Sequence, residues 1–182
     1  MADRPVTRIG LISDTHGLLR PEVFAALEGV ERLLHAGDVE YPDHLSDLSV
    51  IAPVTAVSGN VDGPAVRAGI PEQAVLGVGG VRVALIHGHQ VHPDYRLLLA
   101  RFPDARVIVH GHTHVPRCDV VGDVLLVNPG AAGKAQKGHA PSVAILEVED
   151  GRPTVQHLNL EAPADWRAAP RRSGGQSWQD GQ

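Results

Sequence analysis

The segment Val107-Ile108-Val109-His110-Gly111-His112-Thr113-His114 decides how the rest of the chain is interpreted. Its apolar start is typical of a buried β-strand, and three histidines follow at alternate positions. Side chains two residues apart in an extended segment point the same way, so His112 and His114 are expected to converge just beyond the strand. Gly111 can turn the chain and take His110 out of that register. Because imidazole is a common metal ligand, the segment indicates a metal site at a strand end.

The composition is that of a globular protein and argues against several kinds of partner. The 182 residues are 43% hydrophobic and 20% charged, which suits one domain with a substantial core. A net charge of −5 and only 3% aromatic residues argue against binding of duplex nucleic acid or stacked bases. No apolar run approaches the length of a membrane span, and no signal peptide is evident. With a single cysteine, Cys118, we expect a reduced, cytoplasmic protein without an internal disulfide.

The first part of the chain alternates strands and helices. Apolar runs predict strands at 6–12, 31–36 and 50–57, the last interrupted at Pro53. Helices are predicted at 21–27, with Pro21 in the first turn, and at about 42–48. This alternation indicates a mostly parallel sheet.

The second part of the chain is rich in hairpin signals. Gly79-Gly80, Gly122-Asp123 and Asp150-Gly151 separate paired apolar arms, which predict hairpins at 73–86, 117–127 and 142–160. A helix at 94–101 and a strand at 106–109 lie between the first two hairpins. We expect this part to be antiparallel and the two sheets to pack face to face with helices outside, which is an α/β fold. Residues 1–160 would form a single domain, and the Pro-, Gly- and Ser-rich tail at 161–182 is expected to be poorly ordered.

Metal-ligating side chains follow five of the predicted strands. Ligand sites in sheets with crossover helices lie beyond the carboxyl ends of strands. Helix caps and turn polars are the alternative explanation for any one of these residues, but not for the set. Seven donors are too many for one tetrahedral zinc and suit two divalent cations that share a carboxylate. Nitrogen and oxygen donors without thiolate favour Mn, Fe, Zn, Co or Ni over Mg or Ca. The candidates are Asp14, His16, Asp38, Asn60, His87, His112 and His114.

The order of these motifs resembles that of the calcineurin-like metallophosphoesterases, most closely the small bacterial and archaeal phosphodiesterases of the YfcE type. That family carries D-x-H, G-D, G-N-x-D, H-G-H and G-H-T-H in sequence. The matching segments here are Asp14-Thr15-His16, Gly37-Asp38, Gly59-Asn60-Val61-Asp62, His87-Gly88-His89 and Gly111-His112-Thr113-His114. The resemblance implies a four-layer α/β/β/α sandwich of two mixed sheets flanked by helices.

The resemblance also assigns roles to the donors. Asp14, His16, Asp38 and His114 would hold a first cation, and Asn60, His87 and His112 would complete a second site bridged by Asp38. Asp38, Asn60 and His87 are the predicted catalytic residues, and manganese is the preferred metal. Two divalent cations and two aspartates leave about two positive charges, which suits a bridging hydroxide and a phosphodiester monoanion. The expected reaction is hydrolysis of a small phosphodiester by in-line attack of that hydroxide.

One position departs from the wider superfamily, in which a histidine that protonates the leaving group often follows the asparagine. Val61 occupies that place, so we expect a preference for good leaving groups, or protonation by water or a nearby histidine.

Two other functions remain open. One is a protein-interaction scaffold on the same fold, like the retromer subunit that resembles this family. Such a scaffold would be expected to have lost some of the metal-ligating residues. A phosphomonoesterase would need further basic groups, for which Arg20, Arg67 and Lys134 are the loop candidates. No motif identifies the natural substrate, and none distinguishes a monomer from a homo-oligomer.

The remaining histidines are expected to do less. His35 and His110 are predicted to pack near the site or to make supporting hydrogen bonds. His89 either contacts the substrate or has no direct role in the site. Asp62 could orient a ligand or cap the next segment. The others, predicted to be ordinary surface residues, are His44, His92, His139 and His157.

Overall fold

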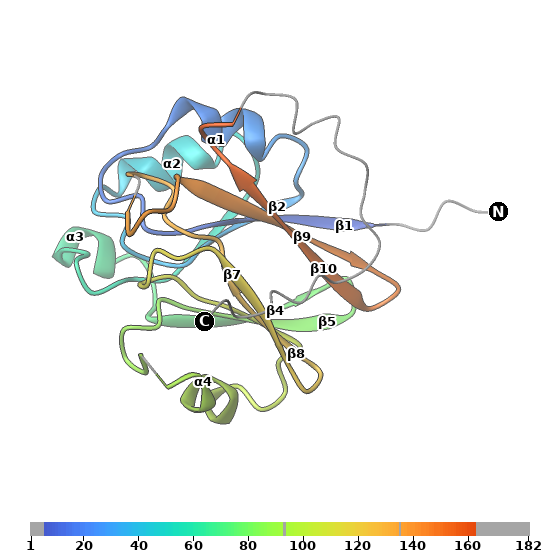
Figure 1. Cartoon of the computed structure of the whole chain (residues 1–182). Helices are drawn as coiled ribbons and strands as arrows, with labels where there is room; N and C mark the ends of the chain where they lie inside the picture. Colours follow the sequence, from blue (N-terminus) through green and yellow to red (C-terminus); the bar gives the residue numbers. More distant parts are fainter. Residues whose placement is uncertain (1–5, 93, 135, 163–182) are drawn as a thin grey trace.

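Two five-stranded mixed sheets pack face to face in the computed structural model, which describes residues 6–92, 94–134 and 136–162 (Figure 1). Sheet A has the order β10-β9-β1-β2-β3, and sheet B has the order β4-β5-β6-β8-β7. The strands of sheet A are β1 (Thr7–Ile12), β2 (Arg32–His35), β3 (Val54–Ala56), β9 (Ser142–Glu149) and β10 (Arg152–Asn159). The strands of sheet B are β4 (Gln73–Val78), β5 (Val81–Ile86), β6 (Val107–Val109), β7 (Arg117–Val121) and β8 (Val124–Asn128).

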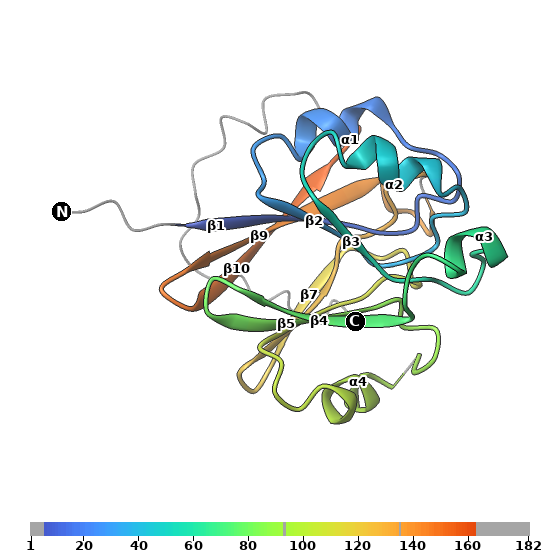
Figure 2. The same ribbon diagram turned by 180° about the vertical axis from the view of Figure 1, so that it is seen from behind.

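Short helices cover the outer faces of both sheets. Helices α1 (Pro21–Ala26) and α2 (Asp43–Leu48) lie on sheet A, and α4 (Tyr95–Arg101) lies on sheet B (Figures 1 and 2). Pro21 opens α1, and the Asp94 side chain caps α4 by accepting a hydrogen bond from the Arg96 amide. The predicted four-layer α/β/β/α sandwich is therefore confirmed.

The central strands are buried on both faces because alternate residues enter different cores. In β1, Leu11 joins the core between the sheets, whereas Ile12 joins the core beneath α1 and α2. In β5, Leu85 joins the core between the sheets, whereas Ile86 joins the core beneath α4. The continuous apolar runs in the sequence therefore correspond to strands that are covered on both sides.

The carboxyl ends of the parallel strands from both sheets meet at one rim. Strands β1, β2 and β3 are mutually parallel in sheet A, as are β5, β6 and β8 in sheet B. The His112 amide, just after β6, donates to the carboxylate of Asp14, just after β1, at 3.2 Å. Loops from the two sheets are thus in direct contact at this rim.

The prediction of an antiparallel second half is wrong. Strands β5, β6 and β8 run parallel because crossover connections link them, and one of those connections contains α4. The β9–β10 hairpin pairs with β1 and so belongs to sheet A. A hairpin signal identifies neighbouring arms but not the sheet that the hairpin joins.

Two local boundaries also differ from the sequence analysis. The strand predicted at 50–57 is reduced to β3, because the chain after α2 continues in turns and Val50 is 82% exposed. A short helix that was not predicted, α3 (Pro64–Arg67), begins with proline, which is a typical first helical residue.

The predicted tail falls mostly at 163–182, outside the described residues, and the domain boundary at residue 160 stays a prediction. Within the described ranges, no helix has the length and hydropathy needed to cross a bilayer.

Candidate metal centre

All seven predicted donors lie at the rim where the parallel strands end. The loops after β1, β2 and β3 supply the donors of sheet A, and the loops after β5 and β6 supply those of sheet B. The donors from sheet A are Asp14, His16, Asp38 and Asn60, and those from sheet B are His87, His112 and His114. Contacts of 3.0–3.9 Å connect each donor to at least one other.

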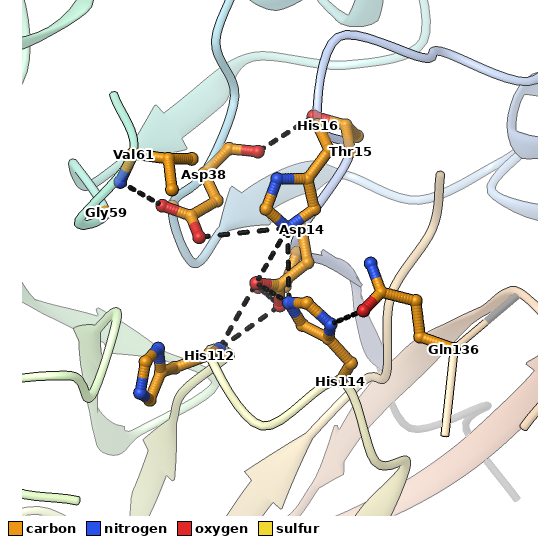
Figure 3. A network of polar contacts seen from close by, with 12 residues as sticks. Asp14, Thr15, His16, Asp38, Gly59, Val61, His112, His114 and Gln136 are labelled. Atoms are coloured by element: carbon orange, nitrogen blue, oxygen red, sulfur yellow. Dashed lines mark hydrogen bonds and ion pairs between the residues drawn. The ribbon is translucent and has the colours of Figure 1, made fainter. Parts of the chain in front are cut away.

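Four of the donors, Asp14, His16, Asp38 and His114, form a compact first group (Figure 3). One ligand atom from each lies within 4.8 Å of all the others. His114 Nε2 is 3.1 Å from Asp14 Oδ1 and 3.1 Å from His16 Nε2. His16 Nε2 is 3.8 Å from Asp38 Oδ2. These separations suit neighbouring ligands of one cation with bonds of about 2.0–2.2 Å.

The second group gathers around the Asn60 side chain. Its Oδ1 atom lies 3.0 Å from His87 Nε2 and 3.1 Å from His112 Nδ1. His87 Nε2 is also 3.1 Å from Asp38 Oδ2, the same oxygen that faces His16. Asp38 is therefore the residue that the two groups share.

Hydrogen bonds on the outer nitrogen orient three of the histidines. The acceptors for Nδ1 are Glu40 Oε1 for His16 (3.1 Å), the Ala36 carbonyl for His87 (2.7 Å) and Gln136 Oε1 for His114 (2.6 Å). When Nδ1 carries the proton, Nε2 presents its lone pair to the centre of the site. Two such lone pairs then face each other on His16 and His114, and a cation or a shared proton makes that contact favourable. The donor set therefore fits a divalent metal.

The electrostatics of the site are dominated by two buried carboxylates, because Asp14 is 0% and Asp38 is 2% exposed. Burial raises the pKa of Asp38, but its hydrogen bond and charge interaction with His87 outweigh that effect, so the pKa is lowered. Burial lowers the pKa of His87, but the hydrogen bond to Asp38 outweighs it, so that pKa is raised. The hydrogen bond to Asp14 raises the pKa of His114. The carboxylates thus favour protonation of the neighbouring histidines, and a bound cation would compete with those protons.

Three of the five loops that carry predicted donors, those after β1, β2 and β6, contain an uncommon backbone conformation. Among the described residues, eight non-glycine residues have positive φ, and six of them lie in these loops. The six are Asp14 (54°), His16 (46°), Asp38 (56°), Glu40 (67°), His112 (66°) and His114 (62°). Such residues cost roughly 1–3 kcal/mol each and cluster at functional sites. The prediction that His112 and His114 share an extended segment is therefore wrong, and although they reach one rim they join different groups.

Two motif glycines allow backbone to approach the aspartates closely. A Cβ atom on Gly59 would overlap Asp38 Oδ1, and one on Gly111 would overlap Ser13 Oγ and lie 2.7 Å from Asp14 Oδ2. Any side chain at either position would displace a carboxylate of the site.

Asp62 ties two of the donor-bearing loops together and does not cap α3, which favours the orienting role over the capping one. Its Oδ2 accepts hydrogen bonds from the Asp38 amide (3.0 Å) and the Gly59 amide (2.7 Å). Its Oδ1 accepts one from the Glu40 amide (2.7 Å). One buried carboxylate therefore holds the loops after β2 and β3 in a common arrangement.

Sequence reasoning missed three supporting residues, Ser13, Glu40 and Gln136. Ser13 Oγ donates to Asp14 Oδ2 at 2.5 Å, and the other two accept hydrogen bonds from histidines of the first group. Ser13 and Glu40 flank motif aspartates, so their position was a usable signal. Gln136 lies 22 residues beyond His114 and follows no motif.

The basic candidates lie near the rim, but two are engaged elsewhere. Arg67 donates to the carbonyl oxygens of Asp62 (2.6 Å) and Gly59 (2.9 Å). Arg20 donates to the Gly133 carbonyl at 2.5 Å, and Lys134 is exposed. Val61 is 45% exposed beside Asp38, to whose Oδ1 its amide donates at 3.1 Å.

The other histidines divide into buried and exposed groups. His35 and His110 are buried near the site as predicted, and burial lowers the pKa of each to about 4. His92 and His139 are exposed as predicted, but His44 is half-buried. The surface prediction for His157 is wrong, because this half-buried ring lies 2.7 Å from the Asn128 carbonyl oxygen.

Comparisons with known proteins agree with this architecture. The model of the calcineurin-like phosphoesterase superfamily domain matches residues 7–151. A probable metallophosphoesterase of Methanothermobacter thermautotrophicus is 37% identical over 166 residues, covering 85% of this chain and 94% of the relative. A phosphodiesterase of Methanocaldococcus jannaschii is 28% identical, covering 78% of this chain and 93% of the relative. The structure of Vacuolar Protein Sorting 29 from Cryptosporidium parvum has a TM-score of 0.72 at 25% identity, covering 86% of this chain and 98% of that one.

Proposed function

Because the chain belongs to the calcineurin-like phosphoesterase superfamily, we propose that it is a hydrolase that uses two divalent cations to cleave a small phosphodiester. The observation that carries the proposal is the position of Asp38, whose Oδ2 faces His16 at 3.8 Å and His87 at 3.1 Å. The first group would hold one cation, and Asp38 with the second group would hold the other. Manganese is the preferred metal, with nickel, iron, zinc and cobalt as alternatives.

When bound, two such cations lower the pKa of a water nucleophile and stabilise negative charge on the phosphoryl oxygens. The residues of the chain prepare that environment. Asn60 contributes a neutral oxygen, so Asp14 and Asp38 are the only carboxylates of the seven donors. Two divalent cations would leave about two positive charges, which favours a monoanionic diester. The Val61 side chain has no proton to donate, which supports a preference for esters with good leaving groups.

Two observations bear on the alternative functions. A phosphomonoester carries a second negative charge, but the guanidinium groups of Arg20 and Arg67 are engaged with carbonyl oxygens. Vacuolar Protein Sorting 29 shares the fold, but a protein-interaction scaffold would not need metal ligands, and all seven donors are present at one rim of this chain. We therefore favour the diesterase, and the single cysteine suits a reducing compartment such as the cytoplasm.

Metal analysis and hydrolysis of one diester series test this proposal together. The chain is stripped with a chelator, reloaded with Mn²⁺, and assayed on diesters ordered by the pKa of their leaving groups. We expect two metals per chain and rates that fall steeply as that pKa rises. Asp38→Asn should lose at least one metal and lower kcat/KM more than about a hundredfold, because it removes a charged ligand.

Asp104→Asn is the matched control, because Asp104 is exposed in the turn after α4. Full metal content without hydrolysis of any diester would favour the scaffold. Faster hydrolysis of the corresponding monoesters would favour the phosphomonoesterase.

A further inference from the structure

The loop after β5 carries two imidazoles that the seven-donor set does not use. This histidine loop, residues 88–92, begins directly after His87. Gly88 has a φ of +104°, and its carbonyl oxygen accepts hydrogen bonds from the Val91 amide (3.1 Å) and the His92 amide (3.0 Å). The loop therefore folds back on itself and keeps His89 and His92 beside the rim.

Both rings of the loop flank the second group of donors. The His89 ring centroid lies 5.4 Å from that of His87 and 6.2 Å from that of His112. The His92 centroid lies 5.3 Å from that of His112 on an exposed side of the site. These ring contacts place both imidazoles beside the second group, although neither residue supplies one of its donors.

The histidine loop also holds polar atoms that lack partners. Among the described residues, three buried side-chain nitrogen or oxygen atoms make no hydrogen bond, and two of them are His89 Nδ1 and Gln90 Nε2. A buried polar atom without a partner is costly, so such atoms are expected to bind water or a ligand. Their concentration on one loop beside the site indicates that these side chains shift to reach a polar ligand there, because neither atom is exposed in this structure.

We propose that His89 and His92 form a substrate-binding subsite in which imidazole N–H groups donate hydrogen bonds to the ester oxygens of a phosphodiester. This inference rests on the proposed function and names the side of the site on which the substrate lies. It accounts for the unpartnered His89 nitrogen and for the placement of His92 against His112. It also supplies hydrogen-bond donors to the substrate in a site where Val61 offers none from its side chain.

The test compares ring-preserving and donor-preserving variants of the Mn²⁺-loaded full chain, with bis(p-nitrophenyl) phosphate as the probe. His89→Phe and His92→Phe keep an aromatic ring but remove the N–H groups. Each should raise KM about three- to tenfold, as expected for one lost hydrogen bond, with two metals still bound per chain. His89→Asn, whose amide can replace the Nδ1 donor, should restore most of the affinity. Gln156→Ala, at an exposed position on β10, is the control.

The outcomes separate this inference from the proposed function. Unchanged KM in both phenylalanine variants, with normal metal content, would overturn the subsite and leave the diesterase intact. Loss of one metal in either variant would also overturn it, because the residue would then support a cation rather than the substrate. A wild-type chain that neither binds nor hydrolyses the diester would reject the proposed function and the subsite with it.

Discussion

At the residue scale, His35 shows how burial makes the stability of this protein sensitive to acid. The ring is fully buried, its Nδ1 accepts a hydrogen bond from the Gly37 amide at 3.2 Å, and burial lowers its pKa to about 4. The unfolded chain binds this proton near pH 6.5, so the contribution of neutral His35 is complete above that pH. It is lost as the pH falls toward 4.

Replacement of His35 by asparagine should therefore reduce acid sensitivity, because the asparagine oxygen can still accept from the Gly37 amide. We expect the loss of unfolding free energy between pH 7 and 4.5 to be smaller by about 2–3 kcal/mol in His35→Asn. Urea unfolding of the metal-free chain at both pH values measures this loss of unfolding free energy. His110, with the same lowered pKa, keeps part of the acid sensitivity, and exposed His139→Asn should behave as wild type. Equal losses in wild type and His35→Asn would show that this ring is not kept neutral by the fold.

Also at the residue scale, the sequence identifies donors better than it identifies their supports. The seven donors could be predicted because each lies in a short motif after an apolar run. Gln136 could not, because only the folded chain brings it within 2.6 Å of His114. His157 resembled a surface residue in a polar-alternating strand, yet its partner is a carbonyl oxygen 29 residues away.

At the scale of elements, the loops after β2 and β3 behave as one unit because Asp62 accepts three amide hydrogen bonds from them. Asparagine at this position keeps one acceptor oxygen but directs an NH₂ group at a backbone N–H. Asp62→Asn should therefore lower the free energy of unfolding by about 1–3 kcal/mol. It should also weaken metal binding about 10- to 100-fold, since both loops carry proposed ligands.

Chemical denaturation and calorimetric titration with Mn²⁺ measure the two effects, and Asp43→Asn, exposed on α2, is the control. If Asp62→Asn loses stability but binds Mn²⁺ with wild-type affinity, the loop connection supports the fold alone and does not orient ligands.

Also at the scale of elements, only part of the topology could be predicted from the sequence. Runs of apolar residues located most strands, and glycine-containing turns located all three hairpins. Strand direction within sheet B could not be predicted, because β6 pairs with β5 and β8 only through long crossover connections. The end of α2 could not be predicted either, since Val50 and Ile51 are apolar, as in a strand, but lie in turns.

At the scale of the whole molecule, the candidate metal centre joins two sheets that also share an apolar core. Asp14, His16, Asp38 and Asn60 extend from sheet A, whereas His87, His112 and His114 extend from sheet B. A cation in either group would have ligands from both sheets, so its binding would oppose their separation. Metal affinity and resistance to unfolding should therefore be coupled in this protein.

Titration with Mn²⁺ measures that coupling. At 100 times the dissociation constant, each occupied site should raise the free energy of unfolding by about 2.7 kcal/mol, because the unfolded chain does not assemble either group. The melting temperature should rise with metal concentration and fall back when a chelator is added. Asp14→Asn should remove the contribution of the first site, and Asn60→Ala should reduce that of the second, whereas Asp104→Asn should change neither. Tight Mn²⁺ binding with an unchanged melting temperature would mean that the cations occupy sites that also exist in the unfolded chain, and would contradict a centre built across the two sheets.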